Sequence, residues 1–194
     1  MREFTIPALA EIQASATLTD TVAARAGQAP DTVVLRRREG EGRWADVTAA
    51  AFWDEVRALA KGIMAAGIRS GDRVGLMSRT SYAWTLIDYA MWTAGAVTVP
   101  VYETSSADQV EWILSDSGCR AVFAETDAHA ALITGVKGSL PDLENIWLID
   151  AIATVTAGGA EVGDDELAAR MSGRGADDLA TIIYTSGTTG RPKG

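Results

Sequence analysis

The sequence has little of the side-chain chemistry on which most thiol and metal sites depend. Its 194 residues include one cysteine, Cys119, and one histidine, His129. A single cysteine cannot form a disulfide within the chain, and it cannot build a metal site made of cysteines. The histidine stands among alanines with no nucleophile motif beside it, so it does not indicate a Ser-His-Asp triad. We expect His129 to be an exposed helix residue.

An excess of positive charge and long apolar runs are also missing. The formal net charge is −9, which disfavours a general role on nucleic acid or on an anionic membrane. The longest strongly apolar stretch, 89–102, is shorter than the roughly 20 residues of a membrane span. Residues 1–20 lack the apolar core of a signal peptide. These absences predict a cytoplasmic protein without a transmembrane segment, and they leave peripheral membrane contact and the oligomeric state open.

What the chain does contain is a regular alternation of helical and strand patterns. Apolar residues recur at helical spacing between Thr48, a candidate N-cap, and Gly67, a candidate left-handed end. Residues 82–92 are apolar on nearly every side, with Asp88 the only charge, as in a helix between two layers. This rhythm predicts an α/β fold with a layered, mostly parallel sheet and flanking helices. Buried strands are expected at 74–77, 97–101, 120–124 and 146–149.

Other segments predict the surroundings of this sheet. We expect Thr19 to cap a first helix over 19–29, and Ser105 and Asp108 to form a capping pair for a later helix. The small, glycine-rich stretch 151–163 is expected to be an irregular surface excursion. Further expected elements are a hairpin of strands 32–37 and 43–47 and helices at 128–136 and 165–171.

The end of the chain carries the strongest chemical signal. An apolar run at 179–184 predicts a buried strand that leads directly into the segment TSGTTGRPKG, residues 185–194. Glycines let a backbone approach a ligand closely, and N–H groups, hydroxyls and cationic side chains together bind anions such as a polyphosphate. The order matches neither the Walker pattern nor the dinucleotide fingerprint. On composition alone, a polar turn between two strands explains the segment equally well.

The exact order of residues 184–194, YTSGTTGRPKG, resembles the signature [YF]-T-S-G-[TS]-T-G-x-P-K-G of the adenylate-forming superfamily. Its members are acyl-CoA synthetases, luciferases and peptide-synthetase adenylation domains. Upstream, 92–100 is similar to the A-G-A-x-x-V-P segment of that family. Residues 99–104 and 111–118 resemble V-P-x-Y-x-T and Y-I-L-x-x-S-G of the long-chain fatty acyl branch, from which Glu103 and Trp112 are departures.

This resemblance implies that residues 1–194 are the incomplete N-terminal part of an AMP-binding domain, truncated after a phosphate-binding loop at 184–194. Such enzymes use ATP and Mg²⁺ to convert a carboxylate into an acyl-adenylate, and then transfer the acyl group to coenzyme A. A long-chain fatty acid is the implied substrate. A fatty acyl-AMP ligase, another carboxylate–CoA ligase and a non-catalytic truncated product are the alternatives. The fragment alone is expected to be inactive.

The same resemblance implies roles for individual residues of the loop. Lys193 would neutralise phosphate charge, whereas Arg191 is expected to be solvated and Tyr184 to pack at the strand end. Tyr102 and Thr104 are weaker candidates for lining the site. The implied ligands of the β- and γ-phosphates are Thr185, Ser186, Gly187, Thr188, Thr189 and Gly190, together with Lys193. The segment Arg79-Thr80-Ser81 is expected to cap a helix, and Trp53, Trp84, Trp92 and Trp112 are expected to serve packing.

Overall fold

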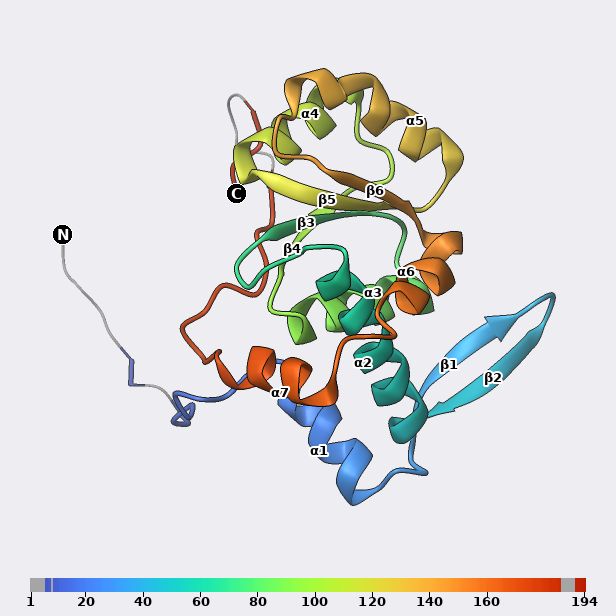
Figure 1. The fold of residues 1–194 in the computed structure, drawn as a ribbon, viewed down its shortest axis with the longest axis vertical. Coiled ribbons are helices and arrows are strands. Elements are labelled where there is room, and N and C mark those ends of the chain that lie inside the picture. Colours follow the sequence, from blue (N-terminus) through green and yellow to red (C-terminus); the bar gives the residue numbers. More distant parts are fainter. Residues whose placement is uncertain (1–5, 8, 186–190) are drawn as a thin grey trace.

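The computed structural model describes residues 6–7, 9–185 and 191–194, and it centres on a parallel sheet of four strands in the order β4-β3-β5-β6 (Figure 1). The strands are β3 Arg73–Met77, β4 Val97–Val101, β5 Cys119–Ala124 and β6 Asn145–Leu148. All three strand pairings are parallel. The predicted layered α/β fold is therefore confirmed, and the strands expected at 74–77, 97–101, 120–124 and 146–149 are present to within about a residue at either end.

Helices cover both faces of this sheet (Figure 1). One face is covered by α2, α3 and α6, with α7 packed on α2 and α3, and the other face is covered by α4 and α5. Successive strand residues alternate between the two cores: Val74 and Leu76 of β3 enter the first, whereas Met77 enters the second. The helices are α2 Ala49–Ala65, α3 Tyr82–Thr93, α4 Ala107–Ser117, α5 Asp127–Val136, α6 Ile152–Gly158 and α7 Asp164–Ser172.

The α2 helix shows how the apolar pattern becomes packing. Thr48 caps its start by accepting a hydrogen bond from the Ala51 N–H at 3.2 Å, and Gly67 follows its end with a left-handed φ of 90°. Phe52 and Ile63 are 2% and 0% exposed. Burying side chains of this size stabilises the fold by about 1.5–3 kcal/mol each before entropy costs. Both sequence predictions for the ends of this helix are confirmed.

Two predicted caps are wrong. Thr19 precedes α1 Asp20–Gln28, but its side chain makes no capping hydrogen bond, because its backbone is already helical rather than extended (φ −83°, ψ −17°). The α4 helix is capped by Ser106 instead of Ser105. The Ser106 N–H in turn donates to Gln109 Oε1 at 3.0 Å, which completes a capping box with glutamine in place of Asp108.

The expected irregular excursion at 151–163 is also wrong, because this segment contains α6. A Cβ atom added to Gly62 of α2 would collide with the Val155 carbonyl, and one added to Gly159 would collide with the α2 backbone. Small residues therefore allow α2 and α6 to approach closely, which composition alone does not distinguish from flexibility.

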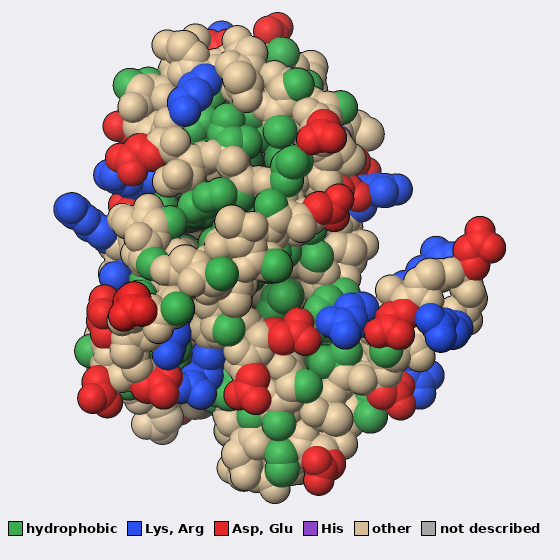
Figure 2. Space-filling model, turned by 45° about the vertical axis from the view of Figure 1, so that its right-hand side comes forward, with side chains coloured by type: hydrophobic (Ala, Val, Ile, Leu, Met, Phe, Trp, Pro, Cys, Tyr) green, Lys and Arg blue, Asp and Glu red, His purple; other side chains and the backbone are tan. Residues whose placement is uncertain are grey.

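The predicted hairpin is present as β1 Val33–Glu39 and β2 Arg43–Thr48, paired antiparallel. It projects from the body of the molecule beside α2 (Figure 1). Arg36 pairs with Asp46 across the two strands at 2.8 Å, and Arg37 lies 5.2 Å from the ring centre of Tyr82. On the face drawn in Figure 2, acidic and basic side chains are interspersed rather than gathered by sign.

The predicted buried strand at 179–184 is largely wrong. Within the described residues, this segment makes only an isolated parallel bridge to β4, between Thr181 and Thr98. Leu179 and Ile183 are 67% and 61% exposed, whereas Tyr184 is 6% exposed.

A proline in β4 explains why this pairing is so short. Thr98 donates its N–H to the Ala180 carbonyl at 3.0 Å, and its carbonyl accepts from the Ile182 N–H at 2.9 Å. Alternate residues of a strand face the same neighbour, so the next donor toward this segment would be residue 100. Pro100 has no N–H, and the ladder stops there.

Candidate functional site: the loop at the carboxyl edge of the sheet

The candidate site lies where the chain end meets the carboxyl ends of the parallel strands. The segment 180–182 runs parallel to β4 on the side away from β3, so that Tyr184 and Thr185 reach the same edge as Met77 and Val101. Ligands of open α/β sheets bind outside this edge. The fold therefore brings the sequence-predicted loop to the edge where such a loop can act.

Two backbone hydrogen bonds close the base of the loop. The Thr185 N–H donates to the Lys193 carbonyl at 3.0 Å, and the Lys193 N–H donates to the Thr185 carbonyl at 3.1 Å. Residues 186–190 lie outside the described part of the chain, so the predicted roles of Ser186, Gly187, Thr188, Thr189 and Gly190 remain predictions. The structure brings the two ends of the motif together, with the Lys193 side chain exposed.

Helix α4 contacts both ends of this loop. The Tyr184 hydroxyl donates to Asp116 Oδ2 at 2.6 Å, and the Trp112 indole N–H donates to the Pro192 carbonyl at 2.8 Å. The Arg191 guanidinium carbon lies 4.7 Å from the ring centre of Trp112. Arg191 is exposed, but it is stacked and not simply solvated as predicted. Burial, with added contributions from Asp116, raises the pKa of Tyr184, so its hydroxyl remains a donor at neutral pH.

A hollow of about 480 Å³ opens beside this loop, above the ends of β3 and β4. Tyr102 lies on its rim and is 72% exposed, whereas Thr104 does not line it. Tyr102 therefore borders this hollow and Thr104 does not, and a role of either residue in binding a ligand stays a prediction. The lining residues are Ser78, Arg79, Thr80, Trp84, Pro100, Val101, Tyr102, Glu103, Ile183 and Tyr184.

The residues after β3 play two structural roles. Ser81 caps α3 by accepting from the Trp84 N–H at 3.1 Å, as predicted. Arg79 instead forms a two-pronged ion pair with Glu125, which follows β5, at 2.8 and 3.0 Å. A hydrogen bond from Arg79 lowers the pKa of Glu125. Because Arg79 also lines the hollow, its guanidinium sets part of the charge there.

A buried acid lies behind the segment that leads into the loop. Asp88 of α3 is 6% exposed, and its Oδ1 accepts a hydrogen bond from Thr98 Oγ1 at 2.6 Å. Burial raises the pKa of Asp88 to about 6, although the Thr98 hydrogen bond acts in the opposite direction. Thr98 also pairs through its backbone with Ala180 and Ile182, and Trp92 donates its indole N–H to the Ala180 carbonyl at 2.9 Å. From the sequence pattern alone, Asp88 is only the single charge on its helix.

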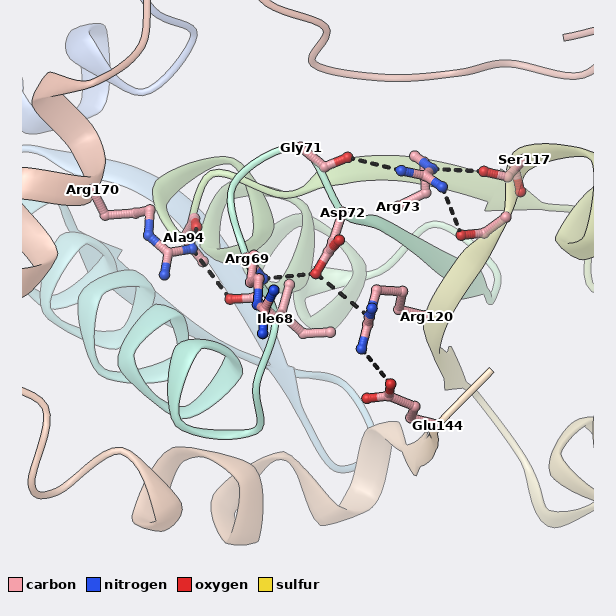
Figure 3. A network of polar contacts seen from close by, with 11 residues as sticks. Ile68, Arg69, Gly71, Asp72, Arg73, Ala94, Ser117, Arg120, Glu144 and Arg170 are labelled. Carbon is pink, nitrogen blue, oxygen red and sulfur yellow. Dashed lines mark hydrogen bonds and ion pairs between the residues drawn. The ribbon is translucent and has the colours of Figure 1, made fainter. Parts of the chain in front are cut away.

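The opposite, amino edge of the sheet is closed by polar contacts (Figure 3). Arg73 donates to the carbonyls of Ser117 and Gly118 at the end of α4, at 2.6 and 3.1 Å. Arg120 pairs with Glu144 and lies 3.6 Å from Asp72. Arg170 donates to the carbonyls of Ile68 and Ala94, which follow α2 and α3. These cations are engaged within the fold.

The described residues were also compared with the requirements of a metal site and of a membrane span. Over 6–7, 9–185 and 191–194, no three His, Cys, Asp or Glu side chains gather as a metal site would require. No helix in the same ranges is both long and apolar enough to cross a membrane. Cys119 is a buried free thiol, and burial raises its pKa to about 11. His129 is half-buried, so the prediction that it is exposed is wrong.

Comparison with known sequences adds to this geometry. The family model described as "AMP-binding enzyme" matches residues 22–194. The long-chain-fatty-acid–CoA ligase FadD15 of Mycobacterium tuberculosis is 43% identical over 199 aligned positions, which cover 100% of this chain and 33% of the relative. The medium-chain acyl-CoA ligase ACSF2 of Danio rerio is 30% identical over 76% of this chain and 28% of its own length. The chain thus spans about a third of the length of these curated relatives.

Solved structures show the same fold. The N-terminal domain of FACL13 from Mycobacterium tuberculosis matches with a TM-score of 0.71 and 28% identity, covering 89% of this chain and 42% of that one. A long-chain-fatty-acid-CoA ligase, FadD1, from Archaeoglobus fulgidus matches with a TM-score of 0.70 and 21% identity, covering 98% of this chain and 38% of that one. At the lower identity, the likeness supports the fold alone.

Proposed function

The chain belongs to the AMP-binding enzyme family, and we propose that it forms part of a ligase that activates a long-chain fatty acid with ATP and joins it to coenzyme A. One observation carries this proposal. A loop with the family's order of glycines, hydroxyls and a lysine is closed by the Thr185–Lys193 backbone pair at the carboxyl edge of a parallel sheet. A polyphosphate fits the donors of this loop in charge and in hydrogen bonding.

The proposed reaction has two steps that differ in their need for this loop. In the first, a carboxylate oxygen forms a bond to the α-phosphorus of ATP, and pyrophosphate leaves with the electron pair of the broken P–O bond. In the second, the coenzyme A thiol loses its proton, its sulfur bonds to the acyl carbon, and AMP leaves with the electrons of the broken C–O bond. Only the first step carries the β- and γ-phosphates.

The residues of this chain would act in the first step by binding and orienting the leaving pyrophosphate. Lys193 supplies a mobile positive charge, and Thr185 a hydroxyl donor, next to the predicted ligands at 186–190. Charge neutralisation at a leaving group is among the larger contributions that an enzyme can make. Mg²⁺ would enter with the nucleotide. Because the described residues form no cluster of metal ligands, none of them is assigned to it.

The hollow beside the loop is the proposed entrance for one of the substrates. Its lining includes the apolar side chains of Ile183, Val101 and Trp84, together with Arg79, which is paired with Glu125. An apolar wall with a few polar groups is typical of a small-molecule site. The other walls of a site of this kind would come from the two thirds of the relatives' length that this chain does not span.

The test is a carboxylate panel assayed on the full-length protein. Acid-dependent ATP–pyrophosphate exchange and coenzyme A-dependent AMP release would be measured with acetate, octanoate, palmitate and benzoate. We expect exchange with all aliphatic acids that bind, and the highest kcat/KM with palmitate. Exchange without AMP release would instead identify an acyl-AMP ligase. No exchange with any of the acids would contradict the proposal.

A medium-chain substrate is the second candidate. It is favoured by the 30% identity to the ACSF2 relatives, which are named medium-chain acyl-CoA ligases. A kcat/KM for octanoate at least tenfold above that for palmitate would decide in its favour.

A further inference from the structure

A second hollow lies at the start of the segment that leads into the loop. Its volume is about 330 Å³, and it lies between the N-terminal segment, the end of α3 and the chain that follows α7. Figure 1 shows the blue N-terminal segment beside the orange-red chain after α7. This N-terminal hollow shares no lining residue with the hollow of about 480 Å³ that contains Ile183 and Tyr184. Its occupant is therefore distinct from the substrate proposed to enter there.

Large apolar side chains of the N-terminal hollow are open to solvent. Ile12, Leu18 and Leu179 are 76%, 55% and 67% exposed. The half-buried ring of Trp92 adds a further apolar surface, because its indole N–H is already bonded to the Ala180 carbonyl. Removal of such surface from water favours the binding of an apolar body.

Among the described residues that line this hollow, Arg174 is the single cation. It follows α7, and its Nε and Nη2 atoms are buried with no hydrogen-bond partner in the described ranges 6–7, 9–185 and 191–194. Burial lowers the pKa of Arg174, although Asp178 and Asp20 act in the opposite direction. A buried guanidinium without a partner is costly, and a bound anion would offset this cost.

The two acids that act on Arg174 through space are bonded to other groups. Asp178 Oδ2 accepts the Gly175 N–H at 2.8 Å. Asp20 accepts both the N–H and the hydroxyl of Thr17, at 2.8 and 2.7 Å. Neither acid is a hydrogen-bond partner of the two buried Arg174 nitrogens. The guanidinium is consequently the polar group of this hollow that best suits a ligand.

Backbone contacts hold the walls of the N-terminal hollow together. The Ala176 N–H donates to the Ala14 carbonyl at 2.9 Å, which joins the chain after α7 to the N-terminal segment. A Cβ atom added to Gly175 would collide with the same carbonyl. The Ala180 carbonyl in turn accepts the Trp92 indole N–H. The hollow therefore exists before any ligand binds, which lowers the entropic cost of binding.

Charge and size restrict the class of ligand. A guanidinium matches a carboxylate through two parallel hydrogen bonds. A phosphate dianion would meet Asp178 on the rim and no second cation among the described lining residues. The volume of about 330 Å³ is near the lower end of the roughly 300–1,000 Å³ typical of small-molecule sites, which favours a short molecule.

We propose that the N-terminal hollow binds a short apolar monocarboxylate, with its carboxylate on Arg174 and its apolar body against Leu18 and Leu179. The ligand is bound and not transformed, because no nucleophile or phosphate-binding group is assigned to this hollow. The inference does not rest on the proposed function.

The test measures ligand binding to the full-length protein by calorimetry, with a non-hydrolysable acyl-adenylate analogue present to fill the reaction site. The probe is hexanoate, hexan-1-ol is its uncharged match, and inorganic phosphate is the second anion. Arg174→Met removes the charge, Arg174→Lys keeps the charge without the planar fork, and Leu18→Ala shortens the apolar wall. Arg38→Met on the exposed hairpin is the matched control.

We expect Arg174→Met to weaken hexanoate binding at least tenfold, because a charge-assisted pair is lost. Arg174→Lys should recover part of this affinity, Leu18→Ala should lose about threefold, and Arg38→Met should match the wild type. Hexan-1-ol should bind equally to the wild type and to Arg174→Met. Phosphate should bind the wild type at least tenfold more weakly than hexanoate does.

Thermal unfolding gives a second readout that a purely structural role of Arg174 would move in the other direction. Without ligand, the midpoint of Arg174→Met should equal or exceed that of the wild type, since an unpaired buried charge is removed. Hexanoate should then raise the midpoint of the wild type and not that of Arg174→Met.

Three results would overturn the inference. The first is a hexanoate affinity of Arg174→Met within twofold of the wild type, and the second is phosphate binding as tight as that of hexanoate. The third is a lower midpoint of Arg174→Met without ligand, which would mean that an acid of the protein itself already pairs with Arg174. Failure of the wild type to activate any carboxylate would contradict the proposed function and leave these binding results unaffected.

Discussion

The two edges of the central sheet use charge in opposite ways. At the amino edge, Arg73, Arg120 and Arg170 are directed inward and bond to helix-end carbonyls or to acids (Figure 3). At the carboxyl edge, Arg79 is paired with Glu125, whereas the Lys193 side chain at the base of the loop is exposed. Strand direction explains the difference, because parallel strands send their helix-entering loops to one edge only. Cations that are bonded within the fold stabilise it, whereas an exposed cation such as Lys193 can reach a ligand.

This comparison predicts that substitutions at the two edges separate function from stability. Changes at the carboxyl edge should alter catalysis and leave the free energy of unfolding unchanged. Changes at the amino edge should lower the free energy of unfolding and leave catalysis unchanged. All measurements below refer to the full-length protein.

The largest effect is expected for Lys193→Ala. Removing the cation proposed to neutralise the leaving pyrophosphate should lower kcat/KM for ATP by roughly 100-fold, in the range found for a lost transition-state donor. The thermal midpoint should not change, because the side chain is exposed. Steady-state adenylation assays check this, with the exposed Lys137→Ala as the control. A loss of less than threefold would contradict the role of Lys193.

A pH effect is expected at the buried acid behind the loop. The pKa of Asp88 is about 6 in the fold and 3.8 for the ordinary side chain. The folded protein therefore binds this proton more tightly, so the stability gained from it is present below about pH 4 and is lost as the pH rises through 6. Asp88→Asn should remove about 2 kcal/mol of this pH-dependent loss. Urea unfolding at pH 4.5 and 7.5 checks the prediction. An equal change in the free energy of unfolding between these two pH values in the wild type and in Asp88→Asn would refute it.

At the amino edge, Arg73→Met should reduce the free energy of unfolding by about 1.5 kcal/mol, because charged hydrogen bonds to the end of α4 are lost. The KM for ATP should remain within twofold if the edges are independent. Arg38→Met, on the exposed hairpin, is the matched control. If Arg73→Met raised the KM for ATP more than twofold and left the free energy of unfolding unchanged, the contrast between the edges would be wrong. The amino edge would then also affect the loop through α4.

The smallest effect is expected for Gly118→Ala. Gly118 ends α4 with a φ of 63°, and an added Cβ would lie 2.7 Å from Arg73 Nη2. The left-handed strain should cost about 1 kcal/mol, and Arg73 can shift aside. Gly138→Ala, where nothing lies within 4 Å, provides the control. Equal unfolding midpoints for the two variants would argue against the strain.

Much of the fold could be predicted from local pattern. The strands at 74–77, 97–101 and 120–124 and the helix ends at Thr48 and Gly67 follow from periodicity and capping chemistry. The failures have a common cause. The small residues of 151–163 indicate an irregular segment by composition, but in the structure they allow this segment to pack closely on α2. Ser106 caps α4 in place of Ser105 because Gln109 lies three residues after Ser106 and completes the capping box.

The candidate site was predicted only as a motif. Its order of residues identifies the loop and Lys193 without any coordinates. The contacts of Trp112, Asp116 and Arg191 join positions separated by 68 to 80 residues in the chain, and no local pattern connects them. From the sequence, Trp112 is expected only to pack, whereas in the structure its indole N–H donates to the Pro192 carbonyl.

By itself, the sequence determined the family and the layered fold, and it predicted the chemistry of the loop, because each depends on residues close together in the chain. Only the tertiary structure decided which edge of the sheet the loop occupies, where its strand stops and which helix holds it. Those outcomes depend on pairings such as Thr98 with Ala180 and Tyr184 with Asp116. They form only when the parallel sheet has brought distant segments within hydrogen-bonding distance.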